Sequence, residues 1–244
     1  MKLPFLICLP LLVAAGIAQA QAPVGQEGAA GQANLAALSK GSMAVLPRGE
    51  SDGTIGSPYA DRRWLLAQLT LRTNRPLAPV PLKYDVLGHR LLMRPLHRTD
   101  SLQLDDHDVT RFALQEPASA LGPARTRVFR RFTEAPYAKN QADYVEVLYE
   151  GRHSLLKHYS KTLNRADFQG AYSANRRYDE IEERTVYYVC TPEGTIAPVK
   201  LALKPLQTAA PILAAELKAA ADAQKPKTEA DWAAVLAAAQ SAIK

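Results

Sequence analysis

The stretch that most constrains the fold of this chain runs from residue 143 to residue 203. It holds four segments rich in Val, Tyr and Thr, which are residue types that β-strands favour. These segments are residues 144–149, 154–163, 184–190 and 195–203. Gly151 and Gly194 lie in the two short gaps between them, so the stretch predicts two β-hairpins. The hairpins are separated by the polar residues 164–183, and loops of that length are usually functional or mobile.

The preceding part of the chain also predicts strands. In residues 64–72, apolar side chains alternate with polar ones, which is typical of a half-buried strand. Further short strands are predicted at residues 80–86, 90–94, 102–104, 109–115 and 126–133. About ten short strands without strand–helix alternation indicate a mainly antiparallel sheet, and a sheet of that size should curl into a sandwich, a roll or a partial barrel.

The C-terminal residues 204–244 change to helical spacing. Pro226 interrupts the pattern, and Thr228 with Asp231 resembles a capping box at a helix start. One apolar stripe then follows at Trp232, Val235, Leu236, Ala239 and Ile243. We therefore expect a helical hairpin packed on the sheet, with Leu69, Leu71 and Val147 as candidate contacts. The fold class predicted is α+β, mainly antiparallel β.

The N-terminus predicts export. Lys2 precedes an apolar run at residues 3–17, and Ala18-Gln19-Ala20 fits a signal-peptidase site, so residues 1–20 are interpreted as a signal peptide. The apolar run is too short for a membrane span, and no stop-transfer pattern follows. The alternative is a retained N-terminal anchor. Lipidation at Cys8 is rejected, because this cysteine lies inside the apolar run.

Composition divides the remaining chain. Residues 21–56 are rich in Ala, Gly and Gln and hold few side chains that could form a core, so we expect a flexible linker. The β body then covers residues 57–203, ahead of the helical hairpin. Cleavage after Ala20 would leave Cys190 as the single cysteine, which excludes an intramolecular disulfide and favours a small core residue.

The net charge of +6 would fall to +5 without Lys2. Interspersed acidic residues favour an ordinary solvated surface. The sequence does not identify a partner; a basic exported protein could meet an anionic envelope polymer or another envelope protein, and nucleic acid is not expected.

No catalytic, cofactor-binding or metal-binding residue is singled out by motif. The acidic cluster at residues 105–108 lacks the spacing and the glycine of a calcium loop and favours a turn. The five histidines show no paired metal-ligand spacing, although tertiary convergence could still bring them together. Ser154 and Lys157 match S-x-x-K, but in a strand they would face opposite ways. The strand tyrosines favour ring packing over a carbohydrate-binding face. These are Tyr144, Tyr149, Tyr159, Tyr187 and Tyr188.

Several short motifs occur in a recognisable order. They are Gly56-Ser-Pro-Tyr59, Trp64, Leu69-Thr-Leu71, Pro81-Leu-Lys-Tyr-Asp85, Tyr149-Glu-Gly151, Leu155-Leu-Lys-His-Tyr159 and Tyr187-Tyr188. From residue 56 to the C-terminus the chain thus resembles uncharacterised, signal-peptide-bearing exported proteins of Bacteroidota-type bacteria. It departs from their pattern at residues 73–75, where a glycine turn is usual. The resemblance implies export and a β-rich body, and it carries no activity.

These observations favour an exported, non-catalytic cell-envelope protein with a structural or binding role, located in the periplasm, on the outer membrane or outside the cell. One alternative is a hydrolase of envelope polymers whose site is assembled only in the fold. Another is a small-ligand carrier with a barrel-type cavity. A deep pocket with converging polar groups would favour either alternative over a purely structural role.

The signal peptide gives the first testable prediction. Protein recovered from the cell envelope should have the mass of a chain beginning at Gln21, because Ala18 and Ala20 satisfy the small-x-small rule of the cleavage site. Intact-mass spectrometry measures this directly. A mass that includes residues 1–20, or a lipid on Cys8, would contradict it.

Overall fold

The computed structural model describes residues 29–39, 44–45, 53–75, 77–95, 100–120, 122–166 and 178–243. Its strands are β1 (Ala44–Val45), β2 (Thr54–Ile55), β3 (Leu65–Leu71), β4 (Val80–Asp85), β5 (Arg90–Met93), β6 (Ser101–Gln103), β7 (Val109–Glu116), β8 (Arg125–Arg131), β9 (Tyr144–Tyr149), β10 (Ser154–Asn164), β11 (Asp179–Cys190) and β12 (Ile196–Val199). Its helices are α1 (Ala29–Ser39), α2 (Leu203–Ala209), α3 (Ala214–Gln224) and α4 (Glu229–Ala242), with 3₁₀ turns η1 (Ala138–Asn140) and η2 (Pro211–Leu213).

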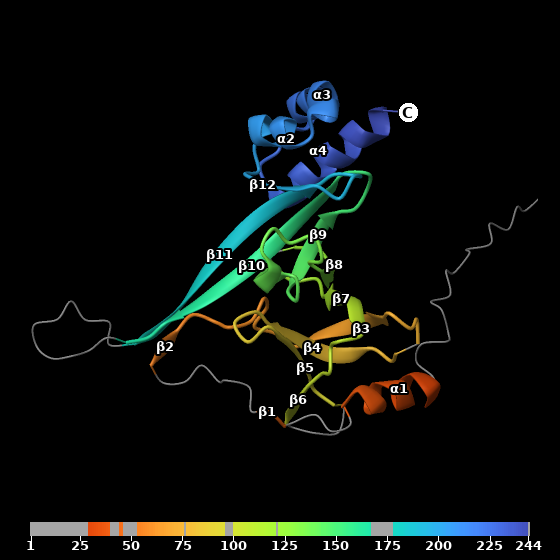
Figure 1. Ribbon diagram of the computed structural model, residues 1–244, viewed down its shortest axis with the longest axis vertical. Helices are drawn as coiled ribbons and strands as arrows, with labels where there is room; N and C mark the ends of the chain where they lie inside the picture. Colours follow the sequence, from red (N-terminus) through yellow and green to blue (C-terminus); the bar gives the residue numbers. More distant parts are fainter. Residues whose placement is uncertain are drawn as a thin grey trace, which may run out of the picture.

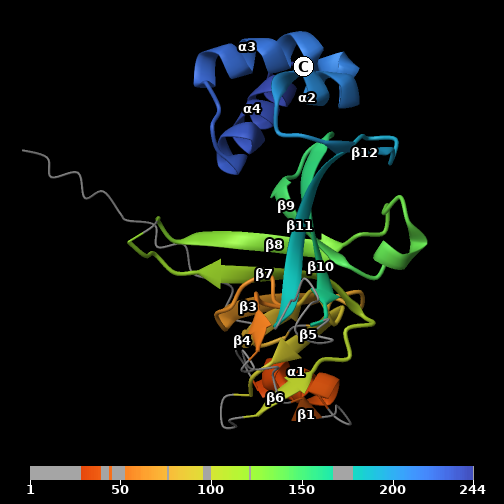
Figure 2. The same ribbon diagram turned by 90° about the vertical axis from the view of Figure 1, so that its left-hand side faces the viewer.

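The described strands join into one twelve-stranded sheet. Its order is β1-β6-β5-β4-β3-β7-β8-β9-β10-β11-β12, and β2 adds to β11 as a parallel strand, whereas the other pairings are antiparallel. Strand directions turn strongly from β3–β5 to the long β10–β11 hairpin, and the C-terminal helices lie at the far end of that hairpin (Figures 1 and 2). The sheet does not close into a barrel. The predicted fold class, a curled antiparallel sheet with C-terminal helices on it, is confirmed.

The larger core lies on β3 to β9. In β3 the side chains of Leu65, Ala67, Leu69 and Leu71 are buried, as the alternation predicted. They surround an aromatic cluster in which the rings of Phe112 and Phe129 stack with centroids 4.8 Å apart. The β3–β4 turn has no glycine, and Asn74 takes the left-handed conformation there (φ 52°), which asparagine tolerates better than most residues.

Part of the expected linker is ordered. Helix α1 lies within residues 21–56, and Leu35 is only 7% exposed because it packs into the larger core. The carbonyl of Gly31 also accepts a hydrogen bond from the Ala78 N–H, at 3.3 Å. Alanine favours helix, and one well-placed leucine attaches it to the body. The expected signal peptide, residues 1–20, and residues 21–28, 40–43 and 46–52 of the expected linker lie outside the described residues.

The C-terminal part forms a second core with one face of β10–β12. Leu155 and Val189 meet Leu217, Val235 and Leu236 there. The expected packing on the sheet is therefore confirmed, but the expected contacts were wrong. Leu69 and Leu71 belong to the larger core, while Val147 packs at the edge of a third cluster, on the opposite face of β10. The described tail also holds a third helix, α2, ahead of the expected pair.

Polar contacts fix the start of α4 against the sheet. Thr228 and Asp231 form the predicted capping box. Lys157 Nζ on β10 lies 2.7 Å from Glu229 Oε1, and the Tyr187 hydroxyl donates to the same oxygen at 2.5 Å. None of the helices described is long and apolar enough to cross a membrane.

Removing an apolar side chain from the second core should destabilise the whole domain. Leu236 is fully buried between α4 and the sheet, and Leu→Ala changes at such sites cost about 2–5 kcal/mol. We expect Leu236→Ala to lower the unfolding free energy by that amount in one cooperative transition, measured with urea. Ile212→Ala is the matched control, because Ile212 is 72% exposed. Equal stability of both variants would show that the tail does not support the sheet.

Candidate functional site

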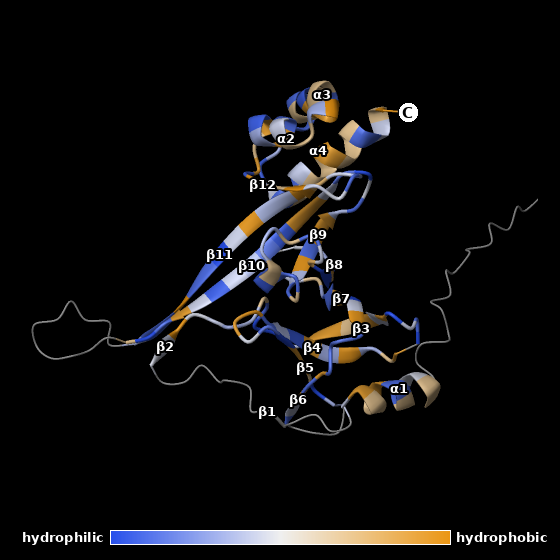
Figure 3. Ribbon diagram, viewed as in Figure 1, coloured by the Kyte–Doolittle hydropathy of each residue, from blue (hydrophilic) through white to orange (hydrophobic). Residues whose placement is uncertain are grey.

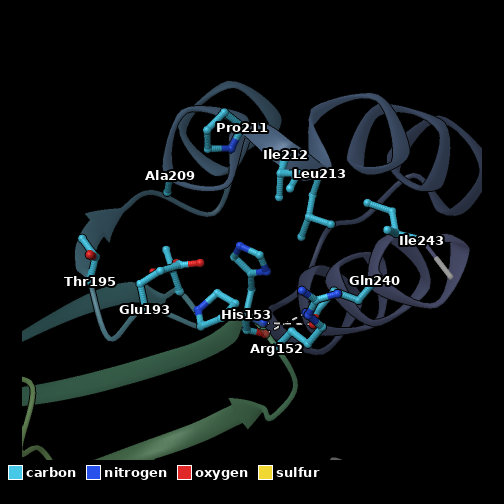
Figure 4. A pocket seen from close by; sticks show the side chains of 12 residues that line it. Arg152, His153, Glu193, Thr195, Ala209, Pro211, Ile212, Leu213, Gln240 and Ile243 are labelled. Atoms are coloured by element: carbon cyan, nitrogen blue, oxygen red, sulfur yellow. Dashed lines mark hydrogen bonds between the residues drawn. The ribbon is translucent and has the colours of Figure 1, made fainter.

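A cavity of about 360 Å³ lies where the β10–β11–β12 strands meet the C-terminal helices. Three parts of the chain enclose it: the turn before β10, the β11–β12 turn, and the helical tail (Figure 4). The lining residues are Arg152, His153, Thr191, Pro192, Glu193, Thr195, Ala209, Pro211, Ile212, Leu213, Gln240 and Ile243. We call this the His153 cavity. Its volume falls in the lower part of the range of small-molecule sites, about 300–1,000 Å³.

His153 is the central polar side chain of this cavity. It is only 7% exposed, and its imidazole projects into the cavity (Figure 4). Its Nδ1 atom is buried and has no hydrogen-bond partner. Buried polar atoms in native proteins are nearly always paired, so this nitrogen is an exception that calls for an explanation.

Helix α4 holds the backbone of His153 from both sides. The His153 N–H donates to Gln240 Oε1 at 3.0 Å, and Gln240 Nε2 donates to the His153 carbonyl at 2.7 Å. Gly151 permits this close approach, since a Cβ atom there would lie 2.8 Å from Gln240 Oε1. The docking of α4 on the turn therefore fixes the backbone of His153, from which the imidazole projects.

The electrostatics of the cavity keep His153 neutral. Burial lowers its pKa, and Arg152 lowers it further, whereas Glu193 acts in the opposite direction. Glu193 is exposed, so its carboxylate is charged at neutral pH. The neutral imidazole of His153 thus has one positive neighbour, Arg152, and one negative neighbour, Glu193.

The helical side of the cavity is apolar. Ala209, Pro211 and Leu213 come from the α2–η2 segment, and Ile243 follows α4. Ile212 lines the cavity too, although most of its side chain is exposed. An apolar wall facing a small group of polar side chains is suited to hold an amphipathic small molecule in a fixed orientation.

Two other histidines converge on a buried carboxylate elsewhere. His89 Nδ1 lies 2.6 Å from Asp143 Oδ1, and His158 Nε2 lies 3.0 Å from Asp143 Oδ2. Asp143 and His158 are buried, whereas the His89 side chain is 61% exposed. In the described ranges, no group of three or more His, Cys, Asp or Glu side chains is arranged to hold a metal ion.

The other residues considered from the sequence have structural surroundings. Asp106 pairs with Arg131 at 3.1 Å beside the turn at residues 107–108. Lys157 is held by Glu229 rather than by Ser154.

The strand tyrosines pack, as expected. Tyr144, Tyr159 and Tyr188 are buried in the core clusters, while Tyr149 and Tyr187 are partly buried against the second core. Cys190 is also buried, in agreement with the expected role of a small core residue.

Comparison of the chain with models of known protein families, with curated proteins and with solved structures finds no match. Its function is therefore argued from the geometry of its own residues. A fold in any case does not determine a function, which depends on the site that the fold carries.

His153 was missed in the sequence because its environment comes from distant residues. Gln240 is 87 positions away, and the lining residues of the β11–β12 turn are about forty positions away. One feature of the sequence does point to this place in the fold. Two consecutive hairpins bring their turns at residues 150–153 and 191–195 to the same end of the sheet, which marks a place where polar groups can meet.

The buried His153 predicts a pH-dependent stability. Its pKa in the folded protein is below the unfolded value of about 6.5, so protonation favours the unfolded state. This contribution to stability is complete above about pH 6.5 and is lost as the pH falls from there toward the folded pKa. We expect urea unfolding of the wild type to lose more stability over this window than unfolding of His153→Leu. Parallel pH profiles would contradict the burial of a neutral imidazole.

Proposed function

We propose that the chain is an exported, non-catalytic cell-envelope protein that binds a small ligand in the His153 cavity. The observation that carries this proposal is the unpartnered Nδ1 of a buried histidine that points into a cavity of about 360 Å³. An unpaired buried polar atom costs about 1–3 kcal/mol. A ligand that supplies the missing hydrogen bond removes this cost on binding.

A contrast within the protein supports the binding role. The buried Arg127 donates to both oxygens of Glu146 at 2.9 Å, and Tyr159 donates to Glu146 at 2.5 Å. These groups satisfy one another, which is typical of a structural network. His153 differs, because its backbone is held by two hydrogen bonds while its buried Nδ1 has no hydrogen-bond partner.

The geometry also favours binding over catalysis in the cavity. Acyl-transfer catalysis requires a nucleophile hydrogen-bonded to its base, and the Nδ1 of His153 has no such partner. The alternative of a small-ligand carrier is thus retained, but with its cavity in a different place. Since the sheet is open, the cavity is formed by two turns and the helical tail rather than by the inside of a barrel.

Export is supported by residues 1–20 and by the resemblance described above, which together favour the periplasm, the outer membrane or the cell exterior. One observation favours the alternative of a hydrolase. His89 has an exposed ring whose Nδ1 is held by buried Asp143, which is the way a carboxylate orients a general base. The His153 cavity remains the preferred site, because its histidine projects into a cavity of about 360 Å³.

Filling the cavity should weaken binding without unfolding the protein. The probe is N-phenyl-1-naphthylamine, a neutral apolar dye whose fluorescence rises in an apolar site. We expect Ala209→Trp to weaken dye binding by roughly tenfold or more, which corresponds to about 1.4 kcal/mol, because the indole would occupy the cavity.

Ala219→Trp is the matched control, because Ala219 is exposed on α3 and does not line the cavity. It should bind the dye like the wild type. Urea unfolding checks that both variants are folded. Equal binding by both variants, or no binding by the wild type, would contradict the proposed function.

A further inference from the structure

We propose that the His153 cavity selects an uncharged amphipathic ligand, an apolar chain or ring that ends in a hydroxyl group, and discriminates against a carboxylate or an ammonium on the same apolar body. This inference rests on the proposed binding function and names the chemical class of the ligand. It is carried by the position of His153 opposite the apolar wall and by the balance of charge around the imidazole.

Nδ1 of His153 can make a hydrogen bond with a ligand. A neutral imidazole nitrogen is either a donor or an acceptor, depending on the tautomer. A hydroxyl group can donate and accept, so it satisfies Nδ1 in either state. It also brings no formal charge into a site where the imidazole itself carries none.

The charges that line the cavity disfavour an ionic ligand. The charged side chains that line the cavity are Arg152 and Glu193, and the residues from the helical tail that line it are uncharged. Arg152 and Glu193 have opposite signs, and their effects on His153 oppose one another. An ionic head group in the cavity would therefore lose hydration without meeting a net opposite charge.

The helical side of the cavity offers an apolar wall to the body of the ligand. The ring of His153 points toward the wall formed by Ala209, Pro211 and Leu213 (Figure 4). A ligand whose hydroxyl contacts Nδ1 can lay its apolar part along this wall and toward Ile243. Each methylene group buried there then strengthens binding through the hydrophobic effect.

The test compares 1-octanol, octanoate and octylammonium, which share one apolar chain and differ in head group. Binding to the protein that begins at Gln21 is measured by calorimetry and by displacement of N-phenyl-1-naphthylamine. The pH is about 7.5, at which the acid and the amine are ionised. We expect octanol to bind at least roughly tenfold more tightly than either ion.

Two variants connect this preference to Nδ1. His153→Phe keeps a ring and removes the nitrogen, so it should weaken octanol binding by roughly tenfold while the dye still binds. His153→Asn places an amide near the position of Nδ1 and should restore part of the octanol affinity. A purely structural role of His153 would instead change octanol and dye binding equally in both variants.

The outcomes separate the two proposals. If octanoate or octylammonium binds as tightly as octanol, or if His153→Phe leaves the head-group preference unchanged, the inference about ligand class is wrong while the binding function stands. If neither the dye nor any octyl probe binds to the wild type, the proposed function itself is wrong.

Discussion

The antiparallel pairing of β10 with β11 is the interaction on which the rest of the structure depends. It runs without interruption from Ser154↔Cys190 to Asn164↔Glu180. Strand β9 adds to the free edge of β10, and β12 and β2 add to different parts of β11. The apolar residues of this hairpin gather in the half next to the helices, whereas the far half is mostly hydrophilic (Figure 3). The helical tail consequently covers one end of the hairpin.

The register of this pairing decides what each face of β10 meets. Leu155 and Lys157 face the helical tail, where they meet the second core and Glu229. Leu156 and His158 face the other way, toward Phe132 and Asp143. A slip of β10 by one residue would exchange the two sets and turn His158 away from Asp143 and Tyr159 away from Glu146. The same register brings residues 150–153 beside residues 191–195 and so creates two sides of the His153 cavity.

Buried polar groups in this protein fall into two kinds. Glu146 is surrounded by donors from Arg127 and Tyr159, and Asp143 by two histidines, so these carboxylates join neighbouring strands into one body. His153 is fixed through its backbone, its imidazole projects into the cavity (Figure 4), and its buried Nδ1 has no hydrogen-bond partner. A rigid support for a side chain that has no internal partner is the arrangement that a binding site requires, because an ordered group loses little entropy when the ligand arrives.

Local features of the chain were readable from the sequence. The alternation in β3, the turn at Gly194 with its positive φ of 79° and the capping box of Thr228 and Asp231 depend on neighbours within a few residues, and the structure has them as expected. The order of α1 was not readable, because it depends on the contact of a single leucine with a distant core. The convergence of His89 and His158 on Asp143 was not readable either, and neither was the hydrogen bond from Gln240 to the His153 backbone, because these residues are far apart in the sequence. Residue periodicity determines which side chains share a face of one element, whereas sheet register and helix docking determine which faces meet. The cavity exists only where those faces meet, so the sequence by itself determined the elements and the tertiary structure decided the site.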